Sequence, residues 1–218
     1  MNDTPNGPHQ TLENPIPYLT ADANRALVAA RLAEGDGRVD DEASFSRIAM
    51  LLYFSALRGL VNFLYEWTGV PNHEWRAFNV AHRWSNAVEL CLPRLEQPGE
   101  ALAFPRDNVG DDLVLLERFL ELKDAVNDLV HDDAPYGAIP VETTPGVFEA
   151  AATFPHTGLP RRQSEYRRAH AESAASVYDA MVARLDLCTR GKVAELRTSD
   201  GNLLRPMLPN NIASDPPI

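Results

Sequence analysis

Cysteine is scarce in this sequence: Cys91 and Cys188 are the only two among 218 residues, and a long stretch of chain separates them. Two distant cysteines in helical contexts favour buried free thiols in a reducing compartment over a disulfide framework. The sequence also lacks CxxC, HExxH and ExxH spacings and any glycine-rich phosphate loop. His73 and His82, nine residues apart, fall on nearly opposite faces of one predicted helix. We therefore expect neither a metal site nor a cofactor.

Positive charge is in deficit. Lysine and arginine number 20 against 31 acidic residues, which gives a net charge of −11. This balance argues against electrostatic binding of nucleic acid or anionic lipid over a broad surface, although it is compatible with a local basic site. Residues 161–168 contain four arginines, the only positive cluster. They form either a phosphate-contacting patch or a solvated helix face paired with Glu165 and Glu172, and we favour the second.

Long apolar runs are also few. Only residues 48–67 are long enough to cross a bilayer, and Arg58, Asn62 and Glu66 interrupt them. A charge at mid-span costs roughly 2.5–3.5 kcal/mol on insertion scales, so we interpret this run as a buried central helix. The N-terminus has neither a basic nor an apolar signal region. We expect a cytoplasmic protein without membrane association.

Apolar residues make up 44% of the chain, which is enough for a real core, and the length suits one domain. Hydrophobic periodicity and end signals predict five helices, with Thr20 as the N-cap of the first and an acidic linker at 36–42. The predicted fold is an all-α, antiparallel bundle of four to five helices. The predicted helices span residues 21–33, 44–67, 73–92, 111–130 and 161–190.

Three segments are predicted to lie outside regular helices. Residues 1–17, rich in proline, form a flexible arm before the bundle domain at 18–190. Residues 134–160 hold five prolines and three glycines, which indicates a long irregular excursion with a short strand or hairpin inside it. Residues 191–218 are expected to form a C-terminal β-hairpin followed by a disordered tail.

The segment KDAVNDLVH carries the most specific polar pattern. Lys123, Asn127 and His131 follow one another at i, i+4 and i+8, so they rise along one side of the helix at 111–130. Lys123 and Asn127 lie on the shoulder of an apolar seam, where a side chain is partly dehydrated yet reachable. A helix C-terminus favours protonated histidine, which can donate a proton to a leaving oxygen while Asn127 orients a phosphate. The alternative is that Asn127 and His131 cap the helix. The seam comprises Leu115, Phe119, Leu122, Val126 and Leu129.

The segment LELKDAVNDLVH, between long helices, resembles the HEPN superfamily of helical bundles. A frequent form of the HEPN motif is Arg-Asn-x-x-x-His, and Asn127 and His131 match its last two residues. The resemblance implies that these two would be catalytic in a metal-independent endoribonuclease working as a dimer. Val126 occupies the arginine position, and members that lack the motif are thought of as binding or partner modules.

Two cations could replace the missing arginine. Lys123 lies one turn before Asn127 but lacks a planar fork for phosphate. Arg58 begins a polar line with Asn62 and Glu66, and it could contact phosphate if that line faces Asn127. The alternative, which we favour, is an internal ion pair between Arg58 and an acid such as Glu66 or Asp128.

The sequence thus predicts an HEPN-like protein that either processes RNA or, because the arginine is missing, binds RNA or a partner with reduced catalysis. The resemblance implies a toxin–antitoxin or defence setting and a homodimer or protein partner. The rival prediction is a non-enzymatic helical protein that acts through protein contacts or regulation. Under that prediction Asn127 and His131 are structural.

Overall fold

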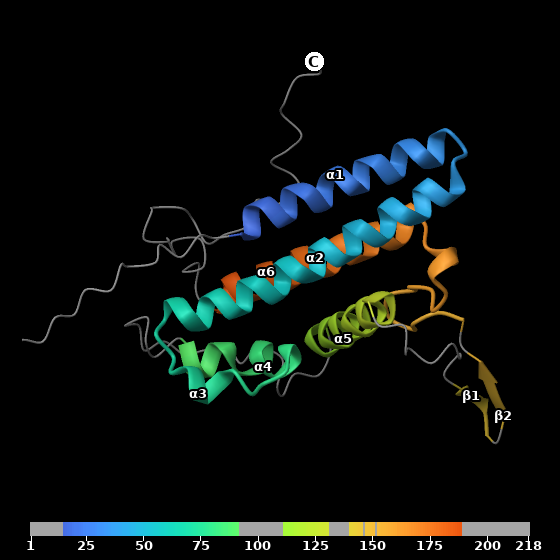
Figure 1. The fold of residues 1–218 in the computed structure, drawn as a ribbon. Coiled ribbons are helices and arrows are strands. Elements are labelled where there is room, and N and C mark those ends of the chain that lie inside the picture. The colour runs from blue at the N-terminus through green and yellow to red at the C-terminus, as the bar shows by residue number, and fades with distance from the viewer. Residues whose placement is uncertain (1–14, 92–110, 131–139, 146, 151, 189–218) are drawn as a thin grey trace, which may run out of the picture.

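The computed structural model describes residues 15–91, 111–130, 140–145, 147–150 and 152–188 (Figure 1). This part of the chain is a helical bundle with one two-stranded hairpin, so the predicted all-α class is confirmed. The elements are α1 (Ile16–Gly35), α2 (Val39–Trp67), α3 (Asn72–Trp75), α4 (Val80–Cys91), α5 (Asp111–Val130), β1 (Pro140–Thr144), β2 (Val147–Ala150), the 3-10 helix η2 (Gln163–Glu165) and α6 (Arg168–Cys188).

Helix α2 is the central element, and α1, α4, α5 and α6 all pack against it. Helices α4 and α5 follow one another along one side of α2, and α6 covers another (Figure 1). Where they meet, Phe119 of α5 contacts both Phe54 of α2 and Trp84 of α4, with ring centroids 6.2 and 6.1 Å apart. Helices α1 and α5 run antiparallel to α2, whereas α6 runs parallel to it: Glu42 meets Arg168 and Tyr53 meets Tyr178.

The central position of α2 explains its composition. Of the helices in the described ranges, α2 is the one whose length and apolarity would allow it to cross a membrane, over Val39–Glu66. In this structure 61% of its most apolar 18-residue window is buried against other helices. The predicted buried central helix is confirmed, and its start moves from residue 44 to Val39.

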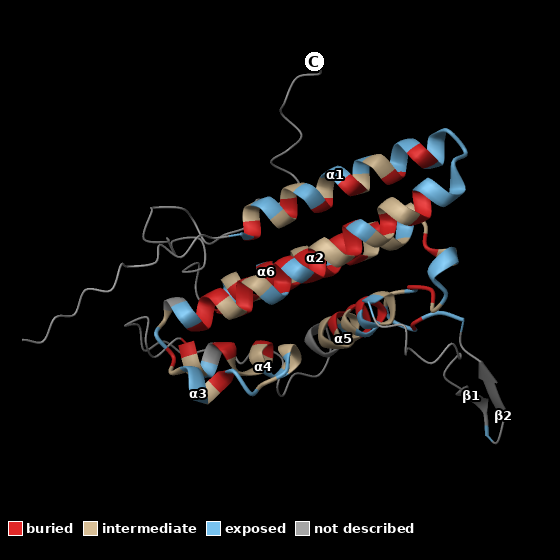
Figure 2. Cartoon of the chain, in the orientation of Figure 1, coloured by how far each residue is buried: buried red, intermediate tan, exposed pale blue. Residues whose placement is uncertain are grey.

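The core runs through the middle of the bundle (Figure 2). Trp75 and Trp84 belong to it, and Cys91 and Cys188 are free thiols buried within it. Burial of both sulfurs confirms the expectation that they do not serve as a disulfide framework.

The start of the chain differs from the prediction. Helix α1 begins at Ile16, with Pro17 in its first turn, where a missing N–H is tolerated. Thr20 is therefore not an N-cap: its hydroxyl donates to the carbonyl oxygen of Ile16 at 2.8 Å and lies 3.1 Å from the Tyr178 hydroxyl. The predicted linker at 36–42 is wrong as well, because α2 starts at Val39 after a tight turn through Gly37 (φ 68°).

The predicted helix at 73–92 is divided into α3 and α4. Asn79 ends the intervening turn and caps α4, because its side-chain oxygen accepts the His82 N–H at 2.9 Å. The last helix starts at Arg168, seven residues later than predicted. Its first turn is held by Glu42 of α2, which accepts the Arg168 N–H at 2.8 Å, and by His170, whose Nδ1 accepts the Arg167 N–H at 2.8 Å.

Part of the predicted excursion at 134–160 is ordered against the bundle. The hairpin expected there is present as antiparallel β1 and β2. Farther on, Glu121 of α5, 8% exposed, accepts the N–H groups of His156 and Thr157 and the Thr157 hydroxyl, at 2.8–3.1 Å. Phe154 and Leu159 are buried beside it. A buried carboxylate thus fixes this loop on α5. The predicted C-terminal hairpin and the arm at 1–14 lie outside the described residues.

Helices α1 and α2 approach closely through small side chains, including Ala23, Ala26 and Ala30, all buried. A Cβ added at Gly59 would lie 3.6 Å from Ile16 Cγ1, an ordinary contact. We expect Gly59→Ala to raise the free energy of unfolding by about 0.5–1 kcal/mol, because alanine loses less backbone entropy in a helix. Urea denaturation measures this. Gly37→Ala, at positive φ, is the matched control and should destabilise; a less stable Gly59→Ala protein would contradict the prediction.

Candidate functional site at the end of helix α5

Helix α5 places Val126 in the core and Lys123 at its half-buried edge, as the periodicity predicted, whereas the partly dehydrated position expected for Asn127 is not found. Val126 is 5% exposed and belongs to the core, together with Phe119 and Leu122. Asn127 is exposed, so the loop at 152–160 does not cover it. Lys123 forms an ion pair with its neighbour Asp124, with Nζ 2.6 Å from Oδ1. His131, the predicted proton donor, lies outside the described residues, so its relation to Asn127 stays a prediction.

Arg58 is not brought to Asn127. It is exposed on α2, and its charge lowers the pKa of Arg83 on α4, which places it toward α4. The end of α5 is instead linked through Gln163 to Arg47, which precedes Arg58 by eleven residues, or about 16 Å along the axis of α2. Within the described ranges no ion pair joins Arg58 to Glu66 or Asp128, so the structure does not contain the internal pair favoured from the sequence.

The cations that do reach the end of α5 come from elsewhere in the chain. Gln163 of η2 donates from Nε2 to the carbonyl oxygen of Asp128 at 3.2 Å, and Arg47 donates from Nη1 to the carbonyl oxygen of Gln163 at 2.8 Å. Arg161 acts electrostatically on the Asp128 carboxylate. The α5 corner, as we call Arg47, Asn127, Asp128, Arg161 and Gln163, therefore unites three distant segments.

The electrostatics of the α5 corner are balanced. Burial raises the pKa of Asp128, while Arg161 lowers it and Asp124 raises it. Tyr166, 2% exposed, has a pKa raised first by burial and then by Asp128, against a smaller opposite effect of Arg47. Its phenol therefore stays neutral at physiological pH. Positive and negative groups of the α5 corner therefore offset one another, and the corner does not form a patch of one charge.

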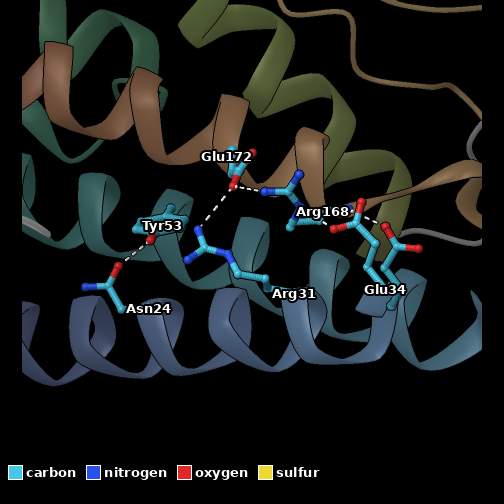
Figure 3. Close-up of polar contacts among 7 residues, drawn as sticks. Asn24, Arg31, Glu34, Tyr53, Arg168 and Glu172 are labelled. Carbon is cyan, nitrogen blue, oxygen red and sulfur yellow. Dashed lines mark hydrogen bonds and ion pairs between the residues drawn. The ribbon is translucent and has the colours of Figure 1, made fainter. Parts of the chain in front are cut away.

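Most arginines of residues 161–168 are occupied by structural contacts. The Arg161 guanidinium lies 4.1 Å from the centroid of the Phe154 ring, and Arg167 donates to the carbonyl oxygens of Ser164 and Tyr166. Arg168 lies between Glu34 of α1 and Glu172 of α6, 2.6 Å from each (Figure 3). The predicted pairing of the cluster with acids is present, and it includes Arg162, which lies 3.7 Å from Glu165. The arginines do not form one helix face, however, because all but Arg168 precede the start of α6.

The described part of the α5 corner offers hydrogen bonding and local positive charge. Asn127 can both donate to and accept from a ligand, and the Arg47 guanidinium has N–H groups besides the one that donates to Gln163. Among the described residues, no group of three or more His, Cys, Asp or Glu side chains is placed to hold a metal ion. The basic run was visible in the sequence, whereas nothing in the sequence singled out Arg47.

No protein-family model matches this chain, and neither the curated proteins nor the solved structures contain a significant match. The fold and the contacts around α5 are therefore the basis for the proposals that follow.

Proposed function

We propose that this chain is an HEPN-like helical module that works by binding a partner and does not cleave RNA. The observation that carries the proposal is the burial of Val126 at the position of the missing arginine. A guanidinium cannot be presented beside Asn127 from that position without breaking the core. Arg58 lies toward α4, and Arg161 is stacked on Phe154, so neither supplies an obvious replacement.

A protein partner fits the surface better than RNA does. The net charge of −11 opposes a polyanion, and the arginines of residues 161–168 are largely engaged. In contrast, the outer side of α1 is exposed (Figure 2), and several large apolar residues of α1 are among its exposed positions. Tyr18, Val28 and Leu32 are 64%, 53% and 62% exposed. The α1 row, as we name it, follows the 3-4-3-4 spacing of a coiled-coil seam. Its members are Tyr18, Ala21, Arg25, Val28 and Leu32.

The partner that fits the α1 row is a second copy of this chain. In an antiparallel pair centred on Arg25, Tyr18 of one copy lies opposite Leu32 of the other, and small Ala21 lies opposite Val28. Arg25 is already paired with Asp22 at 2.6 Å, so the row is electrically neutral in an acidic protein. A seam about 21 Å long falls in the class of small, transient interfaces, so we expect weak self-association.

Sedimentation over a series of protein concentrations tests this association. We expect the wild type to dimerise and the double variant Val28→Glu/Leu32→Glu to be monomeric, because two acids would be buried at the seam. Val130→Glu is the matched control, since Val130 is similarly exposed (60%) but lies at the α5 corner. A monomeric wild type, or loss of the dimer only in Val130→Glu, would contradict the proposed surface.

The non-catalytic part of the proposal is tested separately with labelled single-stranded RNA. We expect wild type and His131→Ala to show the same background cleavage, with no metal added. Cleavage by the wild type that His131→Ala loses would restore the enzymatic prediction. RNA binding that depends on Arg47, in the absence of cleavage, would show that the α5 corner is a nucleic-acid surface and that the partner proposed here is wrong.

A further inference from the structure

A cluster of polar side chains lies between α1, α2 and α6, away from the α5 corner. Tyr53 of α2 donates to the Asn24 side-chain oxygen of α1 at 2.5 Å (Figure 3). The Thr20 hydroxyl of α1 lies 3.1 Å from the Tyr178 hydroxyl of α6. Burial raises the pKa of both tyrosines, and the charge of Asp179, the residue after Tyr178 on α6, raises both further. These contacts join the first helix to the bundle.

Asp179 has unmet hydrogen-bonding capacity in this cluster. Its Oδ1 atom is buried and has no hydrogen-bond partner in the described part of the protein, and the same holds for Nδ2 of Asn24. No described lysine or arginine forms an ion pair with Asp179. Asp179 lies two helical turns after Glu172, which pairs with Arg31 of α1 at 3.4 Å, so it is on the side of α6 that meets α1. The titratable group nearby on α2 is the phenol of Tyr53, on which the Asp179 charge acts. A buried carboxylate oxygen without a donor or a counter-charge is costly.

We propose that Asp179 makes the docking of α1 on α2 and α6 sensitive to pH. When its carboxyl group is protonated, a neutral group that can itself donate a hydrogen bond fills the buried site, and α1 is held firmly. When the group ionises, the desolvated charge weakens the docked state.

The direction of the effect follows from linkage. Burial raises the pKa of Asp179 from the ordinary 3.8 to about 6 in the folded protein, so the docked state binds the proton more tightly than the undocked state. The stabilisation is fully present below the ordinary pKa and is lost as the pH rises through about 6. Tyr53 and Tyr178, whose pKa values burial raises, stay neutral throughout this window.

Hydrogen exchange of the α1 amides at about pH 5 and about pH 7.5, corrected for intrinsic rates, tests the proposal. The full shift from 3.8 to about 6 would lower the protection of α1, relative to α5, roughly tenfold between these two pH values. Because the carboxyl group is partly exposed, we expect a smaller fall, of roughly threefold. Asp179→Asn should remove this pH response. Asp22→Asn is the matched control, because Asp22 lies exposed on α1 and pairs with Arg25; it should keep the response.

Protection of α1 that is independent of pH in the wild type would overturn the proposal, as would a pH response retained in Asp179→Asn. Direct titration of the Asp179 carboxyl carbon by NMR in the wild type provides a readout that needs no variant. A midpoint near 4 would also overturn it. The proposal concerns the docking of α1 and stands whether or not the α1 row binds a second copy.

Discussion

Replacing Val126 by arginine is expected to lower the free energy of unfolding by about 3–5 kcal/mol, although it would recreate the Arg-Asn-x-x-x-His pattern. Val126 is 5% exposed in a core that also contains Phe119, Leu122 and Ala125. An arginine there would bury a charge without a carboxylate partner and overfill packed space. Chemical denaturation measures the loss.

The neighbouring position provides the control. Asn127 is exposed, so Asn127→Arg adds the same side chain one residue later and should change stability by no more than about 0.5 kcal/mol. If Val126→Arg were as stable as the wild type, packing would not exclude the arginine, and the argument against catalysis would lose its main support. Cleavage of RNA gained by Val126→Arg would count against it further.

Periodicity predicted α5 and its seam well, because an amphipathic helix buries one stripe whatever its neighbours are. Phe119, Leu122 and Val126 are buried, as the 4-3-4-3 spacing indicated. Val130, which follows Leu129 of this seam, is 60% exposed because it ends the helix at the rim of the bundle. The bundle class followed from the number and the length of such helices.

Contacts between distant segments could not be predicted in the same way. Thr20 is a favourable N-cap residue in isolation, yet it lies inside α1 and bonds Tyr178. The surroundings of the end of α5 depend on where η2 and the start of α2 are placed, so the sequence suggested Arg58, whereas the structure links Asp128 through Gln163 to Arg47. Charge pattern alone cannot choose between two cations three turns apart on one helix.

The two faces of α1 link the proposals. Its inner face is built from alanines and the polar cluster with Asp179, and its outer face carries the α1 row. The inner contacts dock α1 on the bundle. If ionisation of Asp179 weakens this docking, the residues of the α1 row also become less fixed in position. Self-association through α1 is therefore expected to be tighter below pH 6 than above it, as the direction of the Asp179 pKa shift requires.

Glu42 is the residue whose removal should cost most among the polar contacts. It is 5% exposed on the first turn of α2, and its Oε1 accepts the Arg168 N–H that opens α6, at 2.8 Å. Its Oε2 lies 4.0 Å from Nε of Arg167. Glu42→Ala leaves a helix N-terminus and a guanidinium without this carboxylate, so we expect a loss of about 2–3 kcal/mol.

Two further variants separate the cap from general effects of charge. Glu42→Gln keeps a carbonyl oxygen for the Arg168 N–H and should lose about half as much stability as Glu42→Ala. Asp40→Ala removes an exposed acid from the same turn of α2 and should change stability by no more than about 0.5 kcal/mol. Hydrogen exchange should locate the loss in the first turn of α6, where the amides depend on this cap. Equal losses in Glu42→Ala and Asp40→Ala would mean that the dipole of α2, and not the junction with α6, accounts for the effect.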